Sequence, residues 1–516
     1  MGVASALEAA SSTDYFVDAE LKFEQLTAAL KGRQTQAMKF TDLEKTLEKD
    51  GRELLRMLLE AHIKSRGPGD IGPVVEGSDD VFRTHRRIGT RQIKSIFGDI
   101  EFERISYGGR GEESLFPKDA HLNLPSEYSH SHELQRRVSL EVIKGSFDQA
   151  VESVNEGMGV FIPKQQVEHI TVRAGGDFER FYEQNLSKEK LDLAKLAPLV
   201  VLTTDGKGIV MRKEDLRPAT KKKAESKENK LQGRLSQGEK RNSKRMATVA
   251  SVYNIDKWVR SAEDFKNDLS GPREADSKVR PRPIAKRVWA SVEKDPEIVV
   301  EEMFAEALRR DPDKKKTWVV LVDGDPRQIS RIQDRANELK IPITIVCDII
   351  HVVEYLWKAA WVFHEKGDPK AEEWVNERFI SILEGKSSSV AAGIRRSATN
   401  RKMLKDQRLA IDTCADYLLN KAPYLKYDEY LSQGFPIATG VIEGACRHLI
   451  KDRMDLTGAR WSLEGAEAVL RLRSLKSSGD FPDYWIFHEQ KELERNHLSK
   501  YKKPSVINKN HIKKLK

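Results

Sequence analysis

Leucines recur at helical spacing in residues 41 to 66, where they fall on one face of a helix. Thr41 and Glu44 have the spacing of a capping box at its start, and Pro68 with its neighbouring glycines ends it. The pattern predicts a mostly helical region over residues 1 to 66. The leucines of this face are Leu43, Leu47, Leu54, Leu55 and Leu58.

Two runs rich in Ile and Phe follow in residues 91 to 109, and the Gly98-Asp99 pair between them predicts a β-hairpin. One face of this hairpin can contact phosphates, because several of its side chains are basic. A solvated hairpin face accounts for the same residues equally well. The basic side chains are Arg87, Arg91, Lys94 and Arg104.

A helix-turn-helix pattern comes next. An apolar helix that begins at Phe147 meets Gly157 and Gly159, and a second helix starts near Pro163 with its apolar side chains facing inward. The outward side chains of the second helix are types that contact phosphates or base edges, although many helical hairpins share this outline without binding DNA. These outward residues are Lys164, Gln165, Gln166 and His169.

From about residue 195 apolar strands alternate with helices, which predicts a mixed α/β sheet covered by helices. The first strand is expected to end at Asp205, with residues 208 to 211 starting its partner. Further strands are expected at residues 246 to 255, 317 to 325 and 343 to 349, with helices over 295 to 310 and 327 to 340. A long helical stretch from His351 to about Tyr430 reads as an all-α insertion in the sheet.

These patterns divide the chain into six regions. They are a helical N-terminal region (1–80), a β-hairpin and helix-turn-helix region (81–185), the first part of an α/β core (195–350), an all-α insertion (351–435), core helices (436–480) and a basic C-terminal tail (481–516).

Composition favours a water-soluble chain of 516 residues with a formal charge of +9. No apolar run is long enough to span a membrane, and the first residues lack the pattern of a secretory signal. Three widely spaced cysteines argue against a disulfide framework, so we expect a cytoplasmic protein. Residues 212 to 245 hold 13 basic and 5 acidic side chains, and residues 491 to 516 hold 9 and 2. Both segments suit phosphate binding, and both also suit a solvated loop and tail.

The first candidate catalytic residues are two acids that each follow an apolar strand. Asp205-Gly206 and Asp323-Gly324 lie 118 positions apart, each at the end of such a run. Asp-Gly is also ordinary turn chemistry. Ligands bind at the carboxyl ends of strands in open α/β sheets, so both acids can face one crevice. If the strand continued, Asp325 would share a face with Asp323, so either acid could be the metal ligand. Asp323 is favoured because it directly follows the apolar run.

A third acid, Glu443, lies in the first turn of a helix that Thr439 is placed to cap. It either complements the helix dipole or joins the other two acids. Three carboxylates from separate segments suit Mg²⁺, which prefers oxygen ligands and in pairs supports phosphodiester chemistry. Basic side chains follow Glu443: Arg447 is placed to pair with it or to hold phosphates, and Lys451, Arg453 and Arg460 to grip DNA strands. Trp461 can stack on an unpaired base or belong to the core.

The three acids resemble those of DDE transposases, with Asp205 in "TTDGKG", Asp323 in "VLVDGD" and Glu443 in "GVIEGACRHLIKDR". Asp348 and His351 in "CDIIHVVEYLWKA" are similar to the Asp-x-x-His signature of Mutator-like and several insertion-sequence transposases. The pattern looks most like that of the ISKra group of bacterial insertion sequences, over residues 85 to 480. The 34-residue basic segment departs from it, because it stands where a short hairpin between core strands is expected.

This resemblance implies a ribonuclease H-like core with an all-α insertion and a helix-turn-helix that reads terminal inverted repeats. It implies cleavage and strand transfer with two Mg²⁺ ions, or Mn²⁺ in their place, held by Asp205, Asp323 and Glu443. Asp348 and His351 would lie near the active site, although Asp348 at a strand-to-helix junction is also an ordinary helix cap. The partners implied are double-stranded DNA, as element ends and target, and a second copy or more of the chain, in a bacterial cytoplasm near the nucleoid.

Two other classes fit parts of the pattern. A DNA-binding regulator without catalysis would use the helix-turn-helix but has no need for the three acids to converge. A metal-dependent enzyme on small phosphorylated substrates would use Asp323 and Asp325 alone, without Glu443 or a basic surface.

Overall fold

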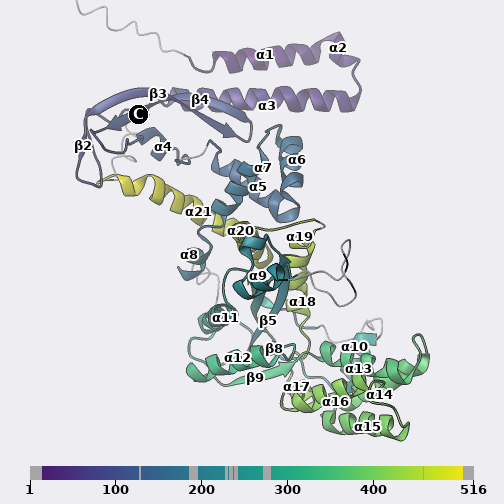
Figure 1. Ribbon diagram of the computed structural model, residues 1–516. Coiled ribbons are helices and arrows are strands. Elements are labelled where there is room, and N and C mark those ends of the chain that lie inside the picture. Colours follow the sequence, from purple (N-terminus) through teal and green to yellow (C-terminus); the bar gives the residue numbers. More distant parts are fainter. Residues whose placement is uncertain are drawn as a thin grey trace, which may run out of the picture. The chain divides into compact units, whose positions relative to one another are not determined.

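The computed structural model describes residues 14–126, 129–184, 196–226, 231, 236, 242–270, 280–456 and 458–503 (Figure 1). The chain forms two compact units. The first comprises Met1–Asp177 with Pro482–Lys516, and the second comprises Phe178–Phe481. Among the described residues, no helix combines the length and the apolar composition needed to cross a membrane.

The first unit opens with helices, as expected. They are α1 (Val17–Lys31), α2 (Arg33–Gln36) and α3 (Phe40–Ser65). The expected capping box is wrong: α3 begins at Phe40, its N-cap position is Lys39, and no side chain caps it, so Thr41 already lies inside the first turn. The leucine face is only partly covered, since Leu47, Leu55 and Leu58 remain exposed.

Antiparallel pairing of β3 (His85–Ser95) with β4 (Gly98–Gly108) confirms the hairpin. Ser95 pairs with Gly98, so the turn lies at residues 96 and 97, slightly earlier than expected. The structure corrects the picture of one basic face. Arg91 Nη1 lies 2.5 Å from Asp119 Oδ2, Arg104 pairs with the same carboxylate, and Arg91 is buried. These two cations therefore fix the hairpin to α4 (Pro117–His121), next to the small β1 (Val75–Glu76) and β2 (Phe82–Arg83) pair.

Three helices form the expected helix-turn-helix region: α5 (His132–Lys144), α6 (Phe147–Met158) and α7 (Lys164–Ala174). Gly159 ends α6 in a left-handed conformation with φ +60°, which a glycine adopts without steric cost. Val167 and Ile170 are buried, as the sequence pattern predicts. The C-terminal segment is more ordered than the expected tail, since it forms α21 (Phe481–Asn496) and a short 3₁₀ turn at Leu498–Lys500.

A five-stranded mixed sheet is the centre of the second unit, with strand order β7-β6-β5-β8-β9. β5 pairs antiparallel with β6 and parallel with β8, β6 pairs antiparallel with β7, and β8 pairs parallel with β9. The mixed α/β architecture is confirmed. The strands are β5 (Leu199–Val210), β6 (Lys244–Ile255), β7 (Ile284–Ser291), β8 (Thr317–Val322) and β9 (Ile343–Cys347).

The sheet corrects two expectations. β5 does not end at Asp205 but continues to Val210, because β6 pairs with it along its whole length, with Asp205 opposite Val249. Residues 208 to 210 therefore belong to the first strand rather than to its partner. The basic segment stands where a short hairpin was expected and makes an ordered hairpin doubtful on sequence grounds, yet β5 and β6 form a continuous antiparallel ladder on either side of it. That segment includes a 3₁₀ turn at Lys213–Asp215 and α9 (Pro218–Glu225).

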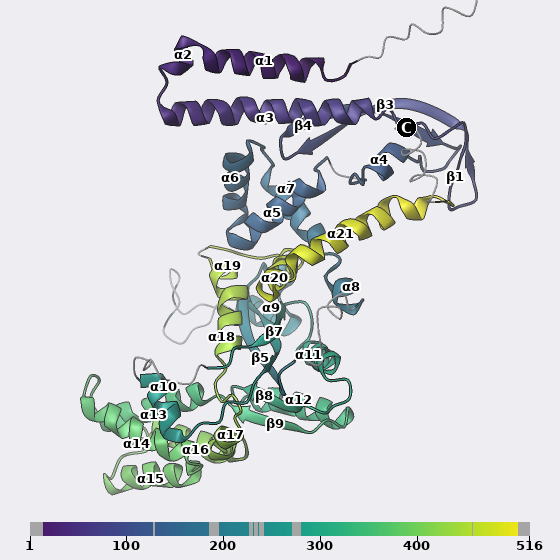
Figure 2. The ribbon, with the colours of Figure 1, turned by 180° about the vertical axis from the view of Figure 1, so that it is seen from behind.

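Helices surround the sheet in the order that the sequence predicts, and the stretch after β9 is helical throughout most of its length. Figures 1 and 2 show α13 to α17 grouped together with α10, next to the end of β9. The helices outside the insertion are α8 (Phe178–Glu183), α11 (Pro296–Arg310), α12 (Pro326–Glu338), α18 (Gly440–Ala445), α19 (Asp452–Met454) and α20 (Leu463–Ser478), and α10 (Ala262–Ser270) packs against α14 of the insertion. The inserted helices are α13 (Ile349–Phe363), α14 (Pro369–Leu383), α15 (Ser387–Asn400), α16 (Leu409–Asn420) and α17 (Tyr427–Ser432).

Candidate active site at the carboxyl ends of the parallel strands

Three acids lie at one level of the sheet. β5 and β8 pair with a constant offset, from Leu199 opposite Thr317 to Thr203 opposite Leu321, and the same offset two residues further places Asp205 level with Asp323. β8 and β9 pair up to Val322 opposite Cys347, so the next positions bring Asp323 level with Asp348. Adjacent strands are about 4.8 Å apart and residues in register share a face. The fold therefore brings the three carboxylates to one edge of the sheet.

Asp205 lies within β5, where three groups surround its carboxylate. Its Oδ1 accepts a hydrogen bond from Gly206 N at 2.6 Å, and its Oδ2 accepts one from Cys446 Sγ at 3.2 Å. Lys207 Nζ lies 3.2 Å from the same Oδ2. Burial, followed by the nearby charge of Asp205, raises the pKa of the Cys446 thiol, so this cysteine acts as a neutral donor to the carboxylate.

The geometry separates the roles of Asp323 and Asp325. Asp323 directly follows β8, and its backbone carbonyl accepts a hydrogen bond from the Tyr417 hydroxyl of α16 at 3.1 Å. Gly324 then turns the chain with φ +98°. Asp325 caps α12, because its side chain accepts a hydrogen bond from Arg327 N at 2.8 Å. Asp323 is thus the acid that lies level with Asp205, while Asp325 already serves the helix.

Glu443 is connected to Asp348 through a hydroxyl. Asp348 is fully buried and caps α13, where it accepts a hydrogen bond from Ile350 N at 3.0 Å. The Thr439 hydroxyl donates to Asp348 Oδ2 and lies 3.5 Å from Glu443 Oε1. Thr439 occupies the N-cap position of α18 as expected, but its side chain makes no cap bond because it is engaged with Asp348. The third acid is therefore held beside the end of β9.

Negative charge is crowded at this site. Burial raises the pKa of Glu443, and the nearby carboxylates of Asp348 and Asp205 raise it further, against the opposing effects of His351 and Thr439. Burial also raises the pKa of Asp348, although its hydrogen bonds from Thr439 and Ile350 lower it. His351 lies on the first turns of α13 with a partly exposed ring, and its Nδ1 is 3.7 Å from Glu354 Oε2. The expected motif residues Asp348 and His351 thus interact electrostatically with Glu443.

The donor atoms suit a hard divalent cation, because they are carboxylate oxygens whose mutual repulsion such a cation would relieve. Asp205, Asp323 and Glu443 nevertheless do not form a closed ligand set among the described residues, since their oxygens do not all lie within 4.8 Å of one another. Lys207 and Cys446 occupy the outer oxygen of Asp205 in this arrangement. Binding a cation would require the three side chains to draw together.

A closed set of ligand-type side chains does occur in the first unit, at Asp177, His488 and Glu492. Asp177 Oδ2 is 2.7 Å from His488 Nδ1 and 2.8 Å from Arg495 Nη2, and Glu492 pairs with Arg173. Two guanidinium groups thus neutralise the two carboxylates, so this cluster is best explained as an ion-pair network that fastens α21. The sequence contained no signal for it, because its members lie about 310 positions apart.

The basic residues after Glu443 divide into exposed and buried groups. A π-helical turn (Cys446–Lys451) carries Arg447, which is exposed and has Asp452 as its ion-pair partner at 3.6 Å, rather than Glu443. Lys451 and Arg460 are exposed, as phosphate binding requires. The prediction that Arg453 grips DNA strands is wrong for this arrangement. It is 2% exposed, its guanidinium lies 4.7 Å from the Trp461 ring, and burial lowers its pKa to about 10.

Trp461 belongs to the core. It is buried, and its Nε1 donates to Met454 O at 3.0 Å. Its backbone also bonds to Val210 O, at the end of β5. The stacking of Trp461 on an unpaired base is therefore excluded in this structure.

The four predicted DNA-contacting residues of α7 all lie on its exposed face. Lys164, Gln165, Gln166 and His169 are exposed, on the side opposite the buried Val167. Lys164 Nζ lies 2.7 Å from Asp148 Oδ2 on α6, an exposed ion pair that a phosphate can replace at little cost.

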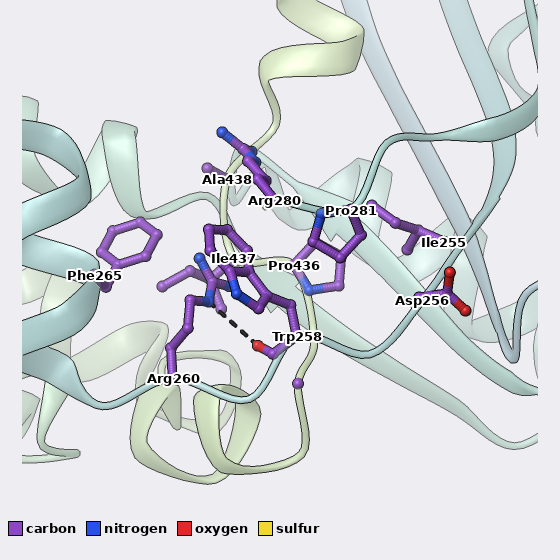
Figure 3. Close-up of a pocket in the computed structure, with 11 residues that line it drawn as sticks. Ile255, Asp256, Trp258, Arg260, Phe265, Arg280, Pro281, Pro436, Ile437 and Ala438 are labelled. Atoms are coloured by element: carbon purple, nitrogen blue, oxygen red, sulfur yellow. Dashed lines mark hydrogen bonds between the residues drawn. The ribbon is translucent and has the colours of Figure 1, made fainter. Parts of the chain in front are cut away.

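A small cavity lies beside the segment that leads to Thr439, and the residues that line it hold that segment in place (Figure 3). Arg260 stacks over the Trp258 ring at 4.2 Å and donates to Phe435 O at 3.2 Å, while Trp258 N donates to Gly434 O at 2.9 Å. The cavity holds about 30 Å³, which is room for about one water molecule and far too little for a nucleotide. Its residues therefore fix the approach to α18 rather than bind a substrate.

Sequence reasoning missed several residues that contact the candidate acids. Lys207 follows Asp205 by two positions on the same strand and was recognisable as a neighbour. Thr439 is a near neighbour of Glu443 in sequence, but its bond to Asp348 spans 91 positions, and Cys446 and Tyr417 reach Asp205 and Asp323 from 241 and 94 positions away.

Comparison with known proteins gives limited guidance. No protein-family model matches the chain. A protein of Streptococcus gallolyticus, described as a UPF0236 protein in the vanSb 3′ region, is 32% identical over 87 residues. That match covers 17% of this chain and 19% of the relative. The chain is thus similar to a UPF0236 protein over a short segment.

Proposed function

We propose that this chain is a DNA transposase that binds the ends of an insertion sequence and catalyses Mg²⁺-dependent strand cleavage and strand transfer. The observation that carries the proposal is the alignment of Asp205, Asp323 and Asp348 at one level of three adjacent parallel strands. Glu443 is joined to this row through Thr439. Asp348 also caps α13, but gathering acids from four separate segments costs stability through their mutual repulsion, which bound divalent cations would relieve.

The sheet supports a ribonuclease H-like core. Its strand order β7-β6-β5-β8-β9, with β6 the strand that runs against its neighbours, is the arrangement expected for that core. The resemblance also expects a long α-helical insertion before the helix of the third acid. Helices α13 to α17 occupy that position, between β9 and α18.

In this proposal Asp205, Asp323 and Glu443 would hold the metal ions. When bound, a pair of Mg²⁺ ions supplies an activated water or 3′-hydroxyl and stabilises the leaving oxygen. Asp348 acts as a positioning residue, because its buried carboxylate holds Thr439 beside Glu443. His351 is close enough to Glu443 for its charge to lower the pKa of that carboxyl, so in this proposal it would stabilise the charged form of the third acid.

DNA recognition would belong to the first unit. The exposed Gln165 and Gln166 on α7 can read base edges of the terminal inverted repeats, while Lys164 and His169 contact phosphates. In the second unit, Arg447, Lys451 and Arg460 are exposed close to the third acid along the chain and suit contacts to the cleaved strands. The working form would be a dimer or larger assembly, because an element has two ends.

For each of the two alternative functions, one observation counts against it. An enzyme on small phosphorylated substrates would need Asp325 as a ligand, but Asp325 caps α12. A regulator without catalysis has no need for Glu443 to lie beside Thr439 and the buried Asp348, at the same end of the sheet as Asp205 and Asp323.

The proposal is tested with the purified chain, Mg²⁺ and a DNA fragment carrying the two ends of the element. Asp205→Asn, Asp323→Asn and Glu443→Gln should each lower nicking and joining at least a thousandfold, because each removes a charged ligand, while DNA binding stays within about twofold. Asp325→Asn is the matched control and should retain activity. Normal cleavage by any of the first three variants would remove that residue from the proposed site.

A further inference from the structure

The α15–α16 loop region, formed by the end of α15 (residues 395–400) and the loop that follows it (residues 401–408), is strongly basic and is not used by the proposed catalytic site. Residues 395 to 408 contain six basic side chains and one acid, a local charge of +5. Two of the cations are neutralised locally, since Arg395 lies 2.6 Å from Asp416 and Arg408 lies 2.8 Å from Asp412. The remaining cations therefore determine what this surface can bind.

Three cations of this loop face solvent without an acidic partner. Arg396, Lys402 and Lys405 are exposed and have no ion pair within the described part of the chain. Unneutralised cations that are this close along a chain repel one another, a cost that a polyanion would remove. The charge thus favours an anionic partner with several regularly spaced charges.

Two leucines accompany these cations. Leu404 and Leu409 are each 70% exposed, which is unusual for side chains whose burial would be favourable. The loop presents them in a fixed conformation: Leu404 N donates to Gln407 Oε1 at 3.0 Å, and Arg408 N donates to Leu404 O at 3.2 Å. Arg401 holds the loop against α13, because its guanidinium carbon lies 4.7 Å from the centre of the Phe363 ring.

We propose that the α15–α16 loop region, together with Leu409 at the start of α16, is a second DNA-binding surface. Arg396, Lys402 and Lys405 contact phosphates, and Leu404 and Leu409 enter the minor groove of a duplex. Cations beside exposed aliphatic side chains are the combination that minor-groove proteins use to hold and kink DNA. Such a surface deepens the proposed transposase function, on which it rests, by adding a contact to duplex DNA that is independent of sequence.

The electrostatic part is tested with the full-length chain in EDTA and a duplex of unrelated sequence. The variant carrying Arg396→Ala, Lys402→Ala and Lys405→Ala should lower the slope of log affinity against log salt by about 2 to 3, since each phosphate contact contributes about 0.9. The matched control carries Lys257→Ala, Lys340→Ala and Lys426→Ala. All three control lysines are exposed in the same unit, and Lys340 has the same left-handed backbone as Lys402. The control should keep the wild-type slope.

Equal slopes for the triple variant and the wild type would overturn the inference and leave the proposed function intact. Failure of the wild type to bind any duplex would overturn both, so the two failures are distinguishable.

The leucines are tested separately. Leu404→Ala with Leu409→Ala should weaken duplex binding severalfold with an unchanged salt slope, and should reduce DNA bending measured by energy transfer between labelled duplex ends. Leu419→Ala, which truncates another exposed leucine of α16, is the control and should change neither. Undiminished bending by the double variant would overturn the assignment to the minor groove.

Discussion

At the scale of single residues, the candidate site consists of acids that would repel one another without a cation. Asp205 and Asp323 were predictable because each follows an apolar run, and Glu443 and Asp348 were named from the resemblance to transposase motifs, whereas the register that places Asp205 level with Asp323 is seen only in the sheet. The contacts of Thr439 and Cys446 were not predictable, since a hydrogen bond across 91 or 241 positions depends on the completed fold. Arg453 shows the converse error, because its sequence neighbours gave no sign that it is buried under Trp461.

The raised pKa of Glu443 predicts how stability depends on pH. A carboxyl whose pKa is higher in the folded state binds its proton more tightly when folded. Its contribution is fully present below the ordinary glutamate pKa and is lost as the pH rises through the folded value. Glu443→Gln, which is neutral at all pH values, should therefore melt at a higher temperature than the wild type at pH 7 to 8 in EDTA. The difference should disappear at acid pH.

Thermal melting of both proteins across this pH range measures the effect. Glu373→Gln, at an exposed position of α14 in the same unit, is the control and should show no such pH-dependent difference. A Glu443→Gln protein less stable than the wild type at pH 8 would mean that the carboxylate is stabilising, which contradicts charge crowding at the site.

At the scale of elements, the periodicity of apolar residues predicted most helices and strands. Charged residues hid one strand, and glycines hid the end of another. β7 escaped notice because Lys286 and Arg287 interrupt its apolar run, although Arg287 is buried and lies 2.6 Å from Glu306 of α11. The continuation of β5 beyond Asp205 was missed because Gly206 and Gly208 resemble a turn. Pairing with β6 keeps those glycines extended.

The exposed face of α7 predicts a specific pattern of DNA-binding defects. Gln165→Ala and Gln166→Ala should each weaken binding to the element ends by about 1 to 3 kcal/mol while affecting random DNA much less, because base-edge contacts are lost. Lys164→Ala should weaken both by a similar factor, since phosphates carry no sequence information. Titrations with cognate and random duplexes measure the difference. Equal losses on both duplexes for the glutamine variants would show that α7 does not read sequence.

At the scale of the whole molecule, the residues proposed to recognise DNA and those proposed to catalyse its cleavage lie in different compact units. The helix-turn-helix lies in Met1–Asp177 with Pro482–Lys516, and the acids lie in Phe178–Phe481. Sequence order alone did not predict that the C-terminal segment belongs with the first unit. That grouping depends on buried ion pairs, such as Arg173 with Glu492, between helices far apart in the chain.

The central claim is that Asp205, Asp323 and Glu443 gather around divalent cations. Anomalous diffraction from crystals of the full-length chain soaked with Mn²⁺ tests it most directly, because manganese is located without reference to activity. If the three acids form the proposed metal site, manganese peaks will lie in contact with all three carboxylates, and the side chains will be closer together than in the structure described above. Manganese only at Asp177, His488 and Glu492, or none near the ends of β5 and β8, would contradict it.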